Sequence, residues 1–444
     1  MKIHFIDKGN DQYLLFVPQT LKFFNVNGTV KNVVTDIENG ISKEEIISKY
    51  SISEETFQNL YNTIYAEPIE EFNPDREGFL SKLVLNVTNK CNLDCKYCYA
   101  CGGSYGSSEC MMDIPTAKLA IDTVLQKYNV IQSIQFFGGE PLLNEPVIRF
   151  VCEYFTKLVE EKKLAGLPAF GTISNGTIYS DQLAETIKKY QIGLTFSIDG
   201  PKSVHDSMRI YKEGTGSFDK VIENIEKYRN AGVPIVGAET TYNINHVNQK
   251  LSVMDTIRYL KDELQISDIH LVPASGDDSA DYKIEDRSGF VDSVSEIFKE
   301  KVENKKEYTY SFVGRILEAL KWKKSNCHLC MAGITQFSVS SKGDIYPCFL
   351  FTDMPEFRLG NVYDKVPFFE NETFTAQKSR FSGFSKYQYP KCKDCFNNRI
   401  CSGCIGANYF ATGDVFETSD LDCDMQRALT EQVLIALSNI SNKR

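Results

Sequence analysis

The segment Cys91-Asn92-Leu93-Asp94-Cys95-Lys96-Tyr97-Cys98-Tyr99 places three cysteines close together, directly after the apolar run Leu83 to Val87, which is typical of a strand. Three thiolates at this spacing can hold three corners of a cubane iron–sulfur cluster. A fourth ligand would close the cluster for electron transfer, whereas three leave one iron open to a small molecule. Zinc is the alternative, but zinc sites more often use paired Cys-x2-Cys knuckles that supply four ligands.

Composition narrows the class of protein. The chain has 444 residues, enough for two or three domains, and is 42% hydrophobic and 24% charged, as in ordinary globular proteins. Its formal net charge of −10 argues against a general nucleic-acid binder. The segment Met1 to Lys8 has no long apolar run, and no stretch approaches the roughly 20 apolar residues of a membrane helix. We therefore expect a cytoplasmic protein, in which fourteen cysteines indicate metal binding instead of disulfides.

Short apolar runs alternate with amphipathic stretches from residue 82 onward. The predicted strands are Leu83–Val87, Ile134–Phe137, Ala169–Ser174, Leu194–Ile198, Ile235–Thr241 and Ile269–Val272. The predicted helices lie near 115–129, 145–162, 180–190, 217–231 and 247–263. Repeated strand–helix units imply parallel strands with right-handed crossovers. Six units predict an α/β fold, a partial (β/α)6 TIM-like barrel with its site at the C-terminal strand ends.

The regions that flank this barrel have different patterns. Residues 1–78 read as a small domain, with a hairpin formed by Tyr13–Val17 and Leu21–Val26 and helices near 30–39, 42–50 and 53–66. An acidic segment with two prolines, 67–77, suits a linker to the barrel domain, residues 79–310. Residues 311–444 form a third domain. After Cys327 it is loop-rich, with few long periodic segments, so we expect it to fold around metal.

Further motifs lie at the ends of the predicted strands. The second strand ends in Gly138-Gly139-Glu140-Pro141, the third in Ser174-Asn175 and the fourth in Ser197-Ile198-Asp199-Gly200, with Arg209 nine residues later. In register with the cysteine loop and Tyr97, these motifs resemble the radical S-adenosylmethionine (radical SAM) family over residues 82–272. In physical terms, glycines permit close backbone approach, carbonyl and carboxylate oxygens suit an ammonium, and arginine is a bidentate partner for a carboxylate.

The resemblance implies roles for these residues. Cys91, Cys95 and Cys98 would bind a 4Fe-4S cluster whose open iron takes the amino and carboxylate groups of S-adenosyl-L-methionine. Gly138 to Pro141 would bind the amino group of the cofactor. The other implied cofactor contacts are Tyr97, Ser174, Asn175, Ser197, Asp199 and Arg209. In the family, an electron from the cluster cleaves the cofactor, and the resulting radical abstracts hydrogen from substrate.

The cysteines of the last third resemble the SPASM extension of radical SAM enzymes, which holds two auxiliary clusters. The close pair Cys401-Ser402-Gly403-Cys404 departs from the family spacing by one residue. By position, the nearer cluster would take Cys330, Cys348 and Cys404, with Cys327 as candidate fourth ligand, and the outer one Cys392, Cys395, Cys401 and Cys423. A zinc ribbon is the alternative, since Cys-x2-Cys pairs suit zinc. Without Cys327, the nearer cluster would keep an iron free for a substrate thiolate.

Other cysteines and the first domain complete the prediction. Cys101 and Cys110 flank a glycine-rich stretch that resembles those of thioether-forming maturases but also suits a flexible loop with incidental thiols. His328 is either a ligand or merely a neighbour of Cys327. Cys152 is expected in the core, on the buried face of an amphipathic helix. Residues 1–78 resemble the PqqD-like peptide-recognition element, a winged-helix domain in which a leader peptide adds a strand to a sheet edge.

The combined pattern favours a peptide maturase of the sactipeptide or ranthipeptide type, which installs Cys thioether crosslinks. Its expected partners are a precursor peptide with a leader and a Cys-containing core, and a reductant such as flavodoxin or ferredoxin. No nucleic acid or membrane is expected. Carbon–carbon crosslinking and formylglycine-type sulfatase maturation are alternatives. A non-catalytic iron–sulfur electron carrier is an alternative of another class, although it has no need of cofactor-binding strand ends.

Overall fold

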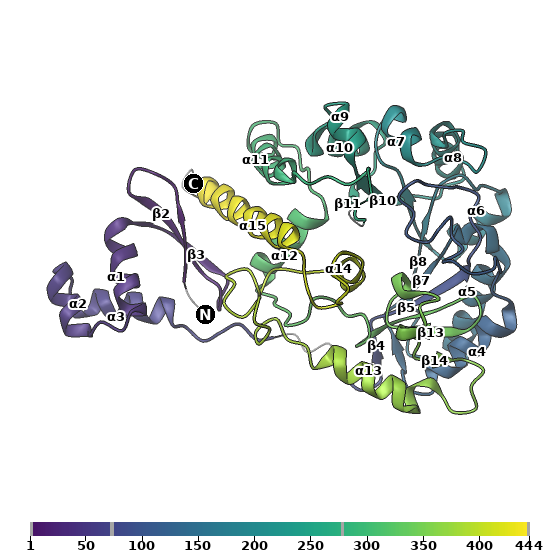
Figure 1. Ribbon diagram of the computed structural model, residues 1–444, viewed down its shortest axis with the longest axis horizontal. Helices are drawn as coiled ribbons and strands as arrows, with labels where there is room; N and C mark the ends of the chain where they lie inside the picture. Colours follow the sequence, from purple (N-terminus) through teal and green to yellow (C-terminus); the bar gives the residue numbers. More distant parts are fainter. Residues whose placement is uncertain (1–2, 72–74, 277–278, 442–444) are drawn as a thin grey trace.

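A nine-stranded, mostly parallel sheet forms the centre of the computed structural model, which describes residues 3–71, 75–276 and 279–441 (Figure 1). The strand order is β11-β10-β9-β8-β7-β5-β12-β13-β14. The strands span β5 Lys82–Thr88, β7 Ser133–Gly138, β8 Ala169–Ser174, β9 Gly193–Ser197, β10 Ile235–Tyr242, β11 Asp268–Pro273, β12 Gln336–Val339, β13 Asp344–Tyr346 and β14 Gly360–Asn361.

The six predicted strands correspond to β5, β7, β8, β9, β10 and β11, and all five pairings between neighbours are parallel. Their spatial order follows the chain order, which is what successive right-handed strand–helix units and a partial barrel require. The predicted α/β class with a parallel sheet is confirmed. Because parallel strands share one carboxyl edge, the loops after β5, β7, β8 and β9 meet there.

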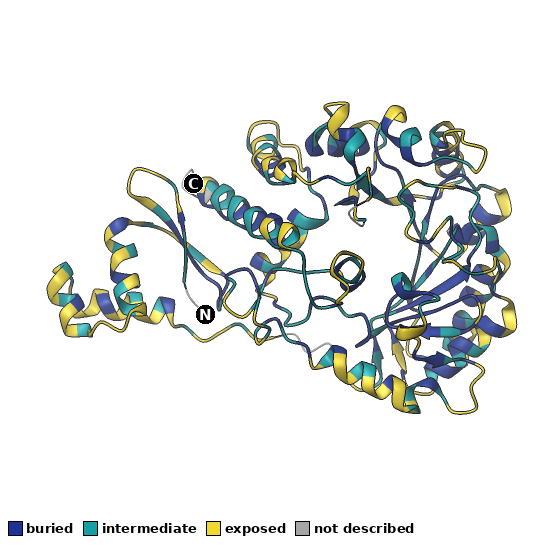
Figure 2. Ribbon diagram, in the orientation of Figure 1, coloured by how far each residue is buried: buried dark blue, intermediate teal, exposed yellow. Residues whose placement is uncertain are grey.

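Helices follow most strands, and a long helix closes the chain. Their bounds are α4 Ile114–Leu125, α5 Glu145–Glu160, α6 Asp181–Lys189, α7 Lys202–Met208, α8 Phe218–Asn230, α9 Ile244–Asn248, α10 Val253–Arg258, α11 Ser288–Glu303, α12 Ser311–Trp322, α13 Glu372–Ser382, α14 Ile405–Thr412 and α15 Asp420–Ser441. Figure 2 shows the buried residues along the central strands and on the helix faces that cover them. Cys152 of α5 is fully buried in this core, as predicted.

One expectation was wrong. The single helix predicted near 247–263 is α9, then α10, then a π-helical turn (η2, Tyr259–Glu263), because Ser252 caps a new helix through a capping box with Asp255. After Cys327, where few long periodic segments were expected, α15 is the one long helix of the described residues, with 22 residues. It packs along α11 and α12 and also contacts β2 and β3.

The first residues form a three-stranded antiparallel sheet with three helices, so the predicted hairpin is confirmed as β2 and β3. The bounds are β1 His4–Asp7, β2 Gln12–Val17, β3 Lys22–Asn27, α1 Gly28–Glu38, α2 Lys43–Tyr50 and α3 Glu54–Ile64. His4 stacks on Phe396 at a centroid distance of 3.7 Å, which docks this sheet on the C-terminal region. Residues 72–74 of the predicted linker lie outside the described residues.

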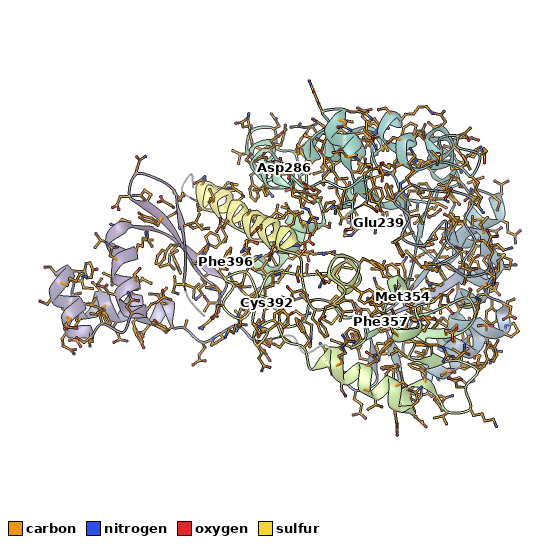
Figure 3. The ribbon with its side chains drawn as sticks, in the orientation of Figure 1. Glu239, Asp286, Met354, Phe357, Cys392 and Phe396 are labelled. Atoms are coloured by element: carbon orange, nitrogen blue, oxygen red, sulfur yellow. The ribbon has the colours of Figure 1, made fainter. Side chains whose placement is uncertain are left out.

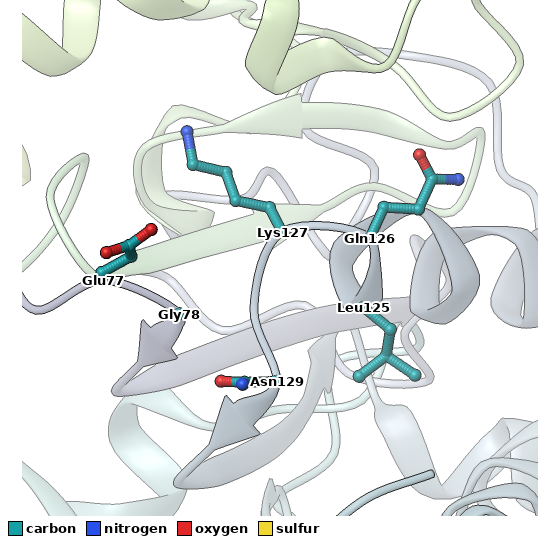
Figure 4. A pocket seen from close by; sticks show the side chains of 6 residues that line it. All are labelled: Glu77, Gly78, Leu125, Gln126, Lys127 and Asn129. Carbon is teal, nitrogen blue, oxygen red and sulfur yellow. The ribbon is translucent and has the colours of Figure 1, made fainter.

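Among the described residues, no helix combines the length and apolar character needed to cross a membrane. A surface hollow lies beside the short parallel strands β4 (Phe79–Leu80) and β6 (Val130–Ile131), between Gly78, Lys127 and Asn129 (Figure 4). It sits before the amino end of β7, so it is at the opposite end of the sheet from the loops that carry the predicted site.

Candidate active site

The cysteine loop follows β5 and is held by backbone hydrogen bonds. The Asp94 N–H donates to the Ile210 carbonyl at 2.8 Å, and the Lys96 N–H donates to the Met208 carbonyl at 3.0 Å. These bonds tie the loop to the segment that leaves α7. The structure thus joins the loop after β5 to the loop after β9, over the carboxyl edge of the sheet.

The three thiols of this loop share one electrostatic environment. Burial, together with the charges of Glu140, Cys95 and Cys98, raises the pKa of Cys91 to about 12. Burial likewise raises the pKa of Cys95 to about 11. Such thiols release their protons when they bind a metal. Three thiols on one short loop are a donor set that fits a cubane cluster with one open iron.

The end of β7 lies directly against this loop. The Gly139 N–H donates to the Thr88 carbonyl at 2.9 Å, and the Glu140 N–H donates to the Lys90 carbonyl at 2.8 Å. A Cβ on Gly138 would lie 1.9 Å from the Thr88 carbonyl oxygen, and a Cβ on Gly139 would lie 2.2 Å from that of Lys90. Only glycine permits this approach.

Glu140 acts as a brace between two strand ends. Its fully buried carboxylate accepts hydrogen bonds from the Leu142 N–H (3.0 Å), the Ser174 hydroxyl (2.9 Å) and the Asn175 N–H (2.7 Å). Burial raises the pKa of Glu140 to about 7, and these three donors oppose the rise. Pro141 begins the 3-10 turn η1, Pro141–Asn144. The carboxylate expected to face a cofactor ammonium thus also holds β7 to β8.

The Asn175 side chain extends the brace to the cysteine loop. Its amide nitrogen donates to the Asn92 side-chain oxygen at 2.9 Å and lies 3.7 Å from the Cys91 sulfur. The motifs at the ends of β7 and β8 and the first cysteine therefore form one hydrogen-bonded unit, although Cys91 and Asn175 are 84 residues apart in the sequence.

A second polar group lies at the end of β9. The buried Asp199 carboxylate lies 3.1 Å from the Arg209 guanidinium, and it accepts hydrogen bonds from the Thr241 N–H at 3.1 Å and from the Tyr97 hydroxyl. The guanidinium lies over the Tyr97 ring, 5.3 Å from its centroid. Burial opposes the charge of Arg209, but Asp199 and Tyr97 raise its pKa. Its buried Nε has no hydrogen-bond partner within the described residues, so this donor is free for a ligand.

Two buried histidines hold the Asp199 backbone. The Asp199 N–H donates to His205 Nδ1 at 3.4 Å, and His246 Nε2 lies 2.8 Å from the Asp199 carbonyl oxygen. Burial lowers the pKa of His205 to about 4, which keeps the ring neutral. Ser197, predicted as a cofactor contact, is the last residue of β9 and pairs in register with Glu239 of β10.

The C-terminal cysteines form two groups. Burial raises the pKa of Cys330 to about 11, with a contribution from Cys404, and burial together with Cys404 and Cys330 raises that of Cys348. Burial raises the pKa of Cys401 to about 11, and Cys423, Cys395 and Cys392 contribute. The cysteines that affect one another in each group come from one of the two ligand sets that the resemblance implies, and the sets themselves stay a prediction. Cys404, whose spacing departs from the family, caps α14 and lies with Cys330 and Cys348.

Cys327 lies in different surroundings. Its pKa is raised by burial and by the charge of Glu71, and the Lys386 ammonium opposes this. Its carbonyl oxygen accepts a hydrogen bond from the Lys386 N–H at 2.8 Å. Cys327 is therefore a neighbour of Lys386, which also lies by Cys392 and Cys401. Within the described residues, no three His, Cys, Asp or Glu side chains are placed to hold a single metal ion.

The glycine-rich stretch covers the cysteine loop. A Cβ on Gly103 would lie 2.7 Å from the Gly139 Cα and 2.9 Å from the Cys91 Cβ. Tyr105 donates to the Gly138 carbonyl at 3.4 Å. The Cys110 sulfur lies 2.8 Å from the Ser341 hydroxyl, whereas Cys101 is exposed. The stretch thus links the loop to the C-terminal region.

Sequence reasoning missed a pair of titratable residues. Glu239 of β10 pairs in register with His270 of β11, so the two side chains are on the same face of the sheet. The Glu239 Oε2 lies 3.9 Å from the His270 Nε2, and Glu239 is labelled in Figure 3. Burial raises the pKa of Glu239 to about 7 and lowers that of His270 to about 4. The sequence contained a possible signal, which was one titratable residue within each of two apolar strands. Whether the two side chains meet depends on the register of the strands, which the sequence does not show.

Two family models match the chain. Residues 85–260 match the model described as the radical SAM superfamily, and residues 330–396 match SPASM, described as an iron–sulfur cluster-binding domain. The first range contains the cysteine loop, Glu140 and Arg209. The second begins at Cys330 and ends just after Cys395.

Full-length relatives are also similar. A cysteine-type anaerobic sulfatase-maturating enzyme of Clostridium perfringens (strain 13 / Type A) is 26% identical over 389 residues, which covers 82% of this chain and 98% of the relative. The radical SAM cyclopropyl synthase TigE of Paramaledivibacter caminithermalis is 24% identical over 388 residues, which covers 81% of this chain and 75% of the relative.

Solved structures share the fold. Native anSMEcpe with bound AdoMet aligns with a TM-score of 0.65 and 22% identity, over 82% of this chain and 100% of that one. Streptococcus suis SuiB bound to the precursor peptide SuiA aligns with a TM-score of 0.54 and 14% identity, over 94% of this chain and 98% of that one.

Proposed function

We propose, on the premise that this chain carries radical SAM and SPASM domains and belongs to the radical SAM superfamily, that it joins a cysteine sulfur of a ribosomally made peptide to a carbon of another residue. It is a radical SAM enzyme whose relatives modify peptides. The two domains imply 4Fe-4S clusters and S-adenosylmethionine as cofactors. The bond formed and the precursor peptide are the proposed parts.

The residues at the carboxyl edge of the sheet have distinct tasks in this proposal. Cys91, Cys95 and Cys98 would hold the first cluster, which with bound S-adenosylmethionine would supply the radical that removes hydrogen from an unreactive carbon. Arg209 offers its free Nε to the carboxylate of the cofactor. Glu140 holds the β7 and β8 loops in place, so that the backbone there can receive the methionine portion.

The group of Cys330, Cys348 and Cys404 is the observation that carries the thioether proposal. These three thiols lie together, whereas Cys327 neighbours Lys386. If these three thiolates alone hold a 4Fe-4S cluster, one iron would be free for the sulfur of a substrate cysteine. A substrate held in this way would present its sulfur to the carbon that loses hydrogen.

The balance of the reaction requires acceptors. Each thioether removes two hydrogens from the peptide. One would leave carbon as a hydrogen atom, taken up by the radical that the cofactor supplies, and the thiol hydrogen would leave as a proton, with the remaining electron accepted by an auxiliary cluster. Glu239 is suited to accept this proton, since its pKa near 7 makes it a base at neutral pH. A flavodoxin or ferredoxin supplies the electron that starts each turnover.

The N-terminal sheet offers a site for the leader of the peptide. β3 is an edge strand whose residues are largely exposed, Phe24 among them. Tyr61 and Tyr65 form an exposed aromatic pair at the end of α3, with ring centroids 4.6 Å apart. An extended leader that pairs with β3 gains main-chain hydrogen bonds, and the tyrosines would add side-chain contacts.

Formylglycine formation on a sulfatase is the second candidate. The cysteine-type sulfatase-maturating enzyme of Clostridium perfringens (strain 13 / Type A) is matched over 98% of its length, which favours this candidate. The likeness to SuiB spans more of this chain, 94% against 82% for anSMEcpe, and favours a precursor peptide.

Co-expression tests the proposal. The chain, reconstituted anaerobically and given S-adenosylmethionine and a reductant, should release 5′-deoxyadenosine. No release would contradict the enzyme assignment and favour a non-catalytic electron carrier. A short Cys-containing peptide encoded beside the gene should lose two hydrogens and one alkylatable thiol per crosslink by mass spectrometry. Loss of hydrogens with an unchanged thiol count indicates carbon–carbon bonds, and conversion of a sulfatase peptide to formylglycine supports the second candidate.

A further inference from the structure

Lys386 is a lysine whose side chain is buried inside the C-terminal domain, with only 2% of the residue exposed. Its ammonium donates a hydrogen bond to the Cys401 carbonyl oxygen, and its backbone N–H donates to the Cys327 carbonyl. In the part of the chain that the structure describes, no carboxylate forms an ion pair with it. A fully buried lysine with a neutral partner is rare, because an uncompensated buried charge costs several kcal/mol.

The other cations near the same cysteines are different. Lys391 is paired with Glu417 at 2.8 Å and with Asp420 at 2.9 Å, and Arg427 is paired with Asp424. Both are partly exposed, so their charges are neutralised by carboxylates and screened by water. Lys386 alone among these three combines burial with the lack of a carboxylate partner in the described residues.

The thiols around Lys386 are the available source of negative charge. Burial lowers the pKa of Lys386, and the charges of Cys401, Cys392, Cys327 and Cys395 oppose this by favouring the ammonium. Three of these cysteines belong to the outer ligand set. Figure 3 labels Cys392 in the region between the N-terminal sheet and the central sheet. Four thiolates that hold a 4Fe-4S core carry a net negative charge, and this charge grows by one on reduction.

We propose that Lys386 is the buried counter-charge of the outer cluster and that its ammonium raises the reduction potential of that cluster. The inference rests on the proposed function, since it needs the outer auxiliary cluster. A fixed positive charge in a low-dielectric site favours the more negative, reduced state of the cluster. The outer cluster thereby becomes the better acceptor for the electron released during crosslinking. Lys386 is a positioning residue, because it acts on the cluster and not on the peptide.

Three variants of the full-length, reconstituted chain test this role. Lys386→Met removes the charge and keeps an unbranched chain, Lys386→Arg keeps the charge, and Lys393→Met is the matched control. Lys393 is exposed and lies between Cys392 and Cys395 in the sequence, so water screens its charge. Iron and sulfide are counted first. The outer-cluster potential is then measured by a redox titration followed by electron paramagnetic resonance.

The outcomes are distinct. Lys386→Met should shift the outer-cluster potential to a more negative value, while Lys386→Arg and Lys393→Met should stay near the wild type. Loss of about four irons in Lys386→Met but not in Lys386→Arg would also support the counter-charge. An unchanged potential in Lys386→Met, a shift equal to that of Lys393→Met, or equal iron loss in both Lys386 variants would overturn it. A wild-type chain without the outer cluster would instead refute the proposed function.

Discussion

The Arg209 guanidinium lies 3.1 Å from the Asp199 carboxylate, and the two residues are 8% and 0% exposed. The pair joins the end of β9 to the segment after α7, and therefore to the cysteine loop, which is bonded to that same segment. A buried pair of this kind fixes the direction of the guanidinium. Asp199 holds Nη2, whereas Nε is left without a partner in the described residues and is available to a ligand.

Arg209→Lys should weaken the binding of S-adenosylmethionine by about 10- to 100-fold, because lysine keeps the charge but lacks the planar fork. Lysine is preferred to alanine here, since alanine would leave Asp199 buried and unpaired. Equilibrium dialysis on the reconstituted protein measures the affinity. Arg149→Lys, which alters a surface pair with Glu145, is the control. Equal affinities for the two variants would remove Arg209 from the cofactor site.

Gly139→Ala should disrupt the junction between β7 and the cysteine loop. The new Cβ would lie 2.2 Å from the Lys90 carbonyl oxygen, and backbone cannot yield as a flexible side chain can. We expect about 1–3 kcal/mol of lost stability together with reduced iron content and cofactor affinity. Gly166→Ala is matched, because a Cβ there meets no atom within 4 Å. If both variants bind iron and cofactor equally well, the close approach is not required.

Much of the central sheet could be predicted from the sequence. The strand Ala169–Ser174 is predicted with its exact bounds, because its apolar pattern is short and bounded by turn residues. The strands β12, β13 and β14 were missed, since each has only two to four residues and β12 gains its partner from β5, some 250 residues earlier. Local propensity carries little information on such a pairing.

The site divides in the same way. Spacing alone placed Cys91, Cys95 and Cys98 on one loop, since neighbours in sequence remain neighbours in space. Glu239 and His270 are about 30 residues apart, and only the register of β10 with β11 brings them together. The burial of Lys386 likewise depends on the packing of loops with no periodic pattern. Charged residues in such places look like ordinary surface residues until the fold is known.

Cys95→Ala should remove about four irons per chain and abolish release of 5′-deoxyadenosine, while the auxiliary clusters remain. Cys101→Ala is the control, because Cys101 is exposed and its sulfur is not among the expected ligands. Iron, sulfide and zinc are measured together after anaerobic reconstitution. Zinc in place of iron and sulfide, or undiminished cofactor cleavage by Cys95→Ala, would contradict the assignment of this loop.

Glu239→Gln should separate the two halves of the reaction. The variant keeps the shape of the side chain but cannot accept a proton, so crosslinking should fall by about 100-fold or more while cofactor cleavage continues. In the wild type, the crosslinking rate should rise with pH through about 7, as Glu239 becomes ionised. Glu226→Gln, at an exposed position of α8, is the control. A parallel loss of cleavage and crosslinking would indicate a structural role for Glu239.

His205 should make the fold sensitive to mild acid. Burial lowers its folded-state pKa to about 4 from an ordinary value of 6.5, so its contribution to stability is fully present above pH 6.5 and is lost as the pH falls toward 4. At pH 5.5 the loss is about 1 kcal/mol.

His205→Asn keeps an acceptor for the Asp199 N–H but cannot gain a proton, so it should show a smaller fall in the free energy of unfolding between pH 7.5 and 5.5. Anaerobic urea titrations of the two proteins at both pH values measure this difference, and the other titrating groups cancel in the comparison. An equal fall in both proteins would show that protonation of His205 does not govern the acid response, and the neutral ring would then matter only for holding Asp199 beside Arg209.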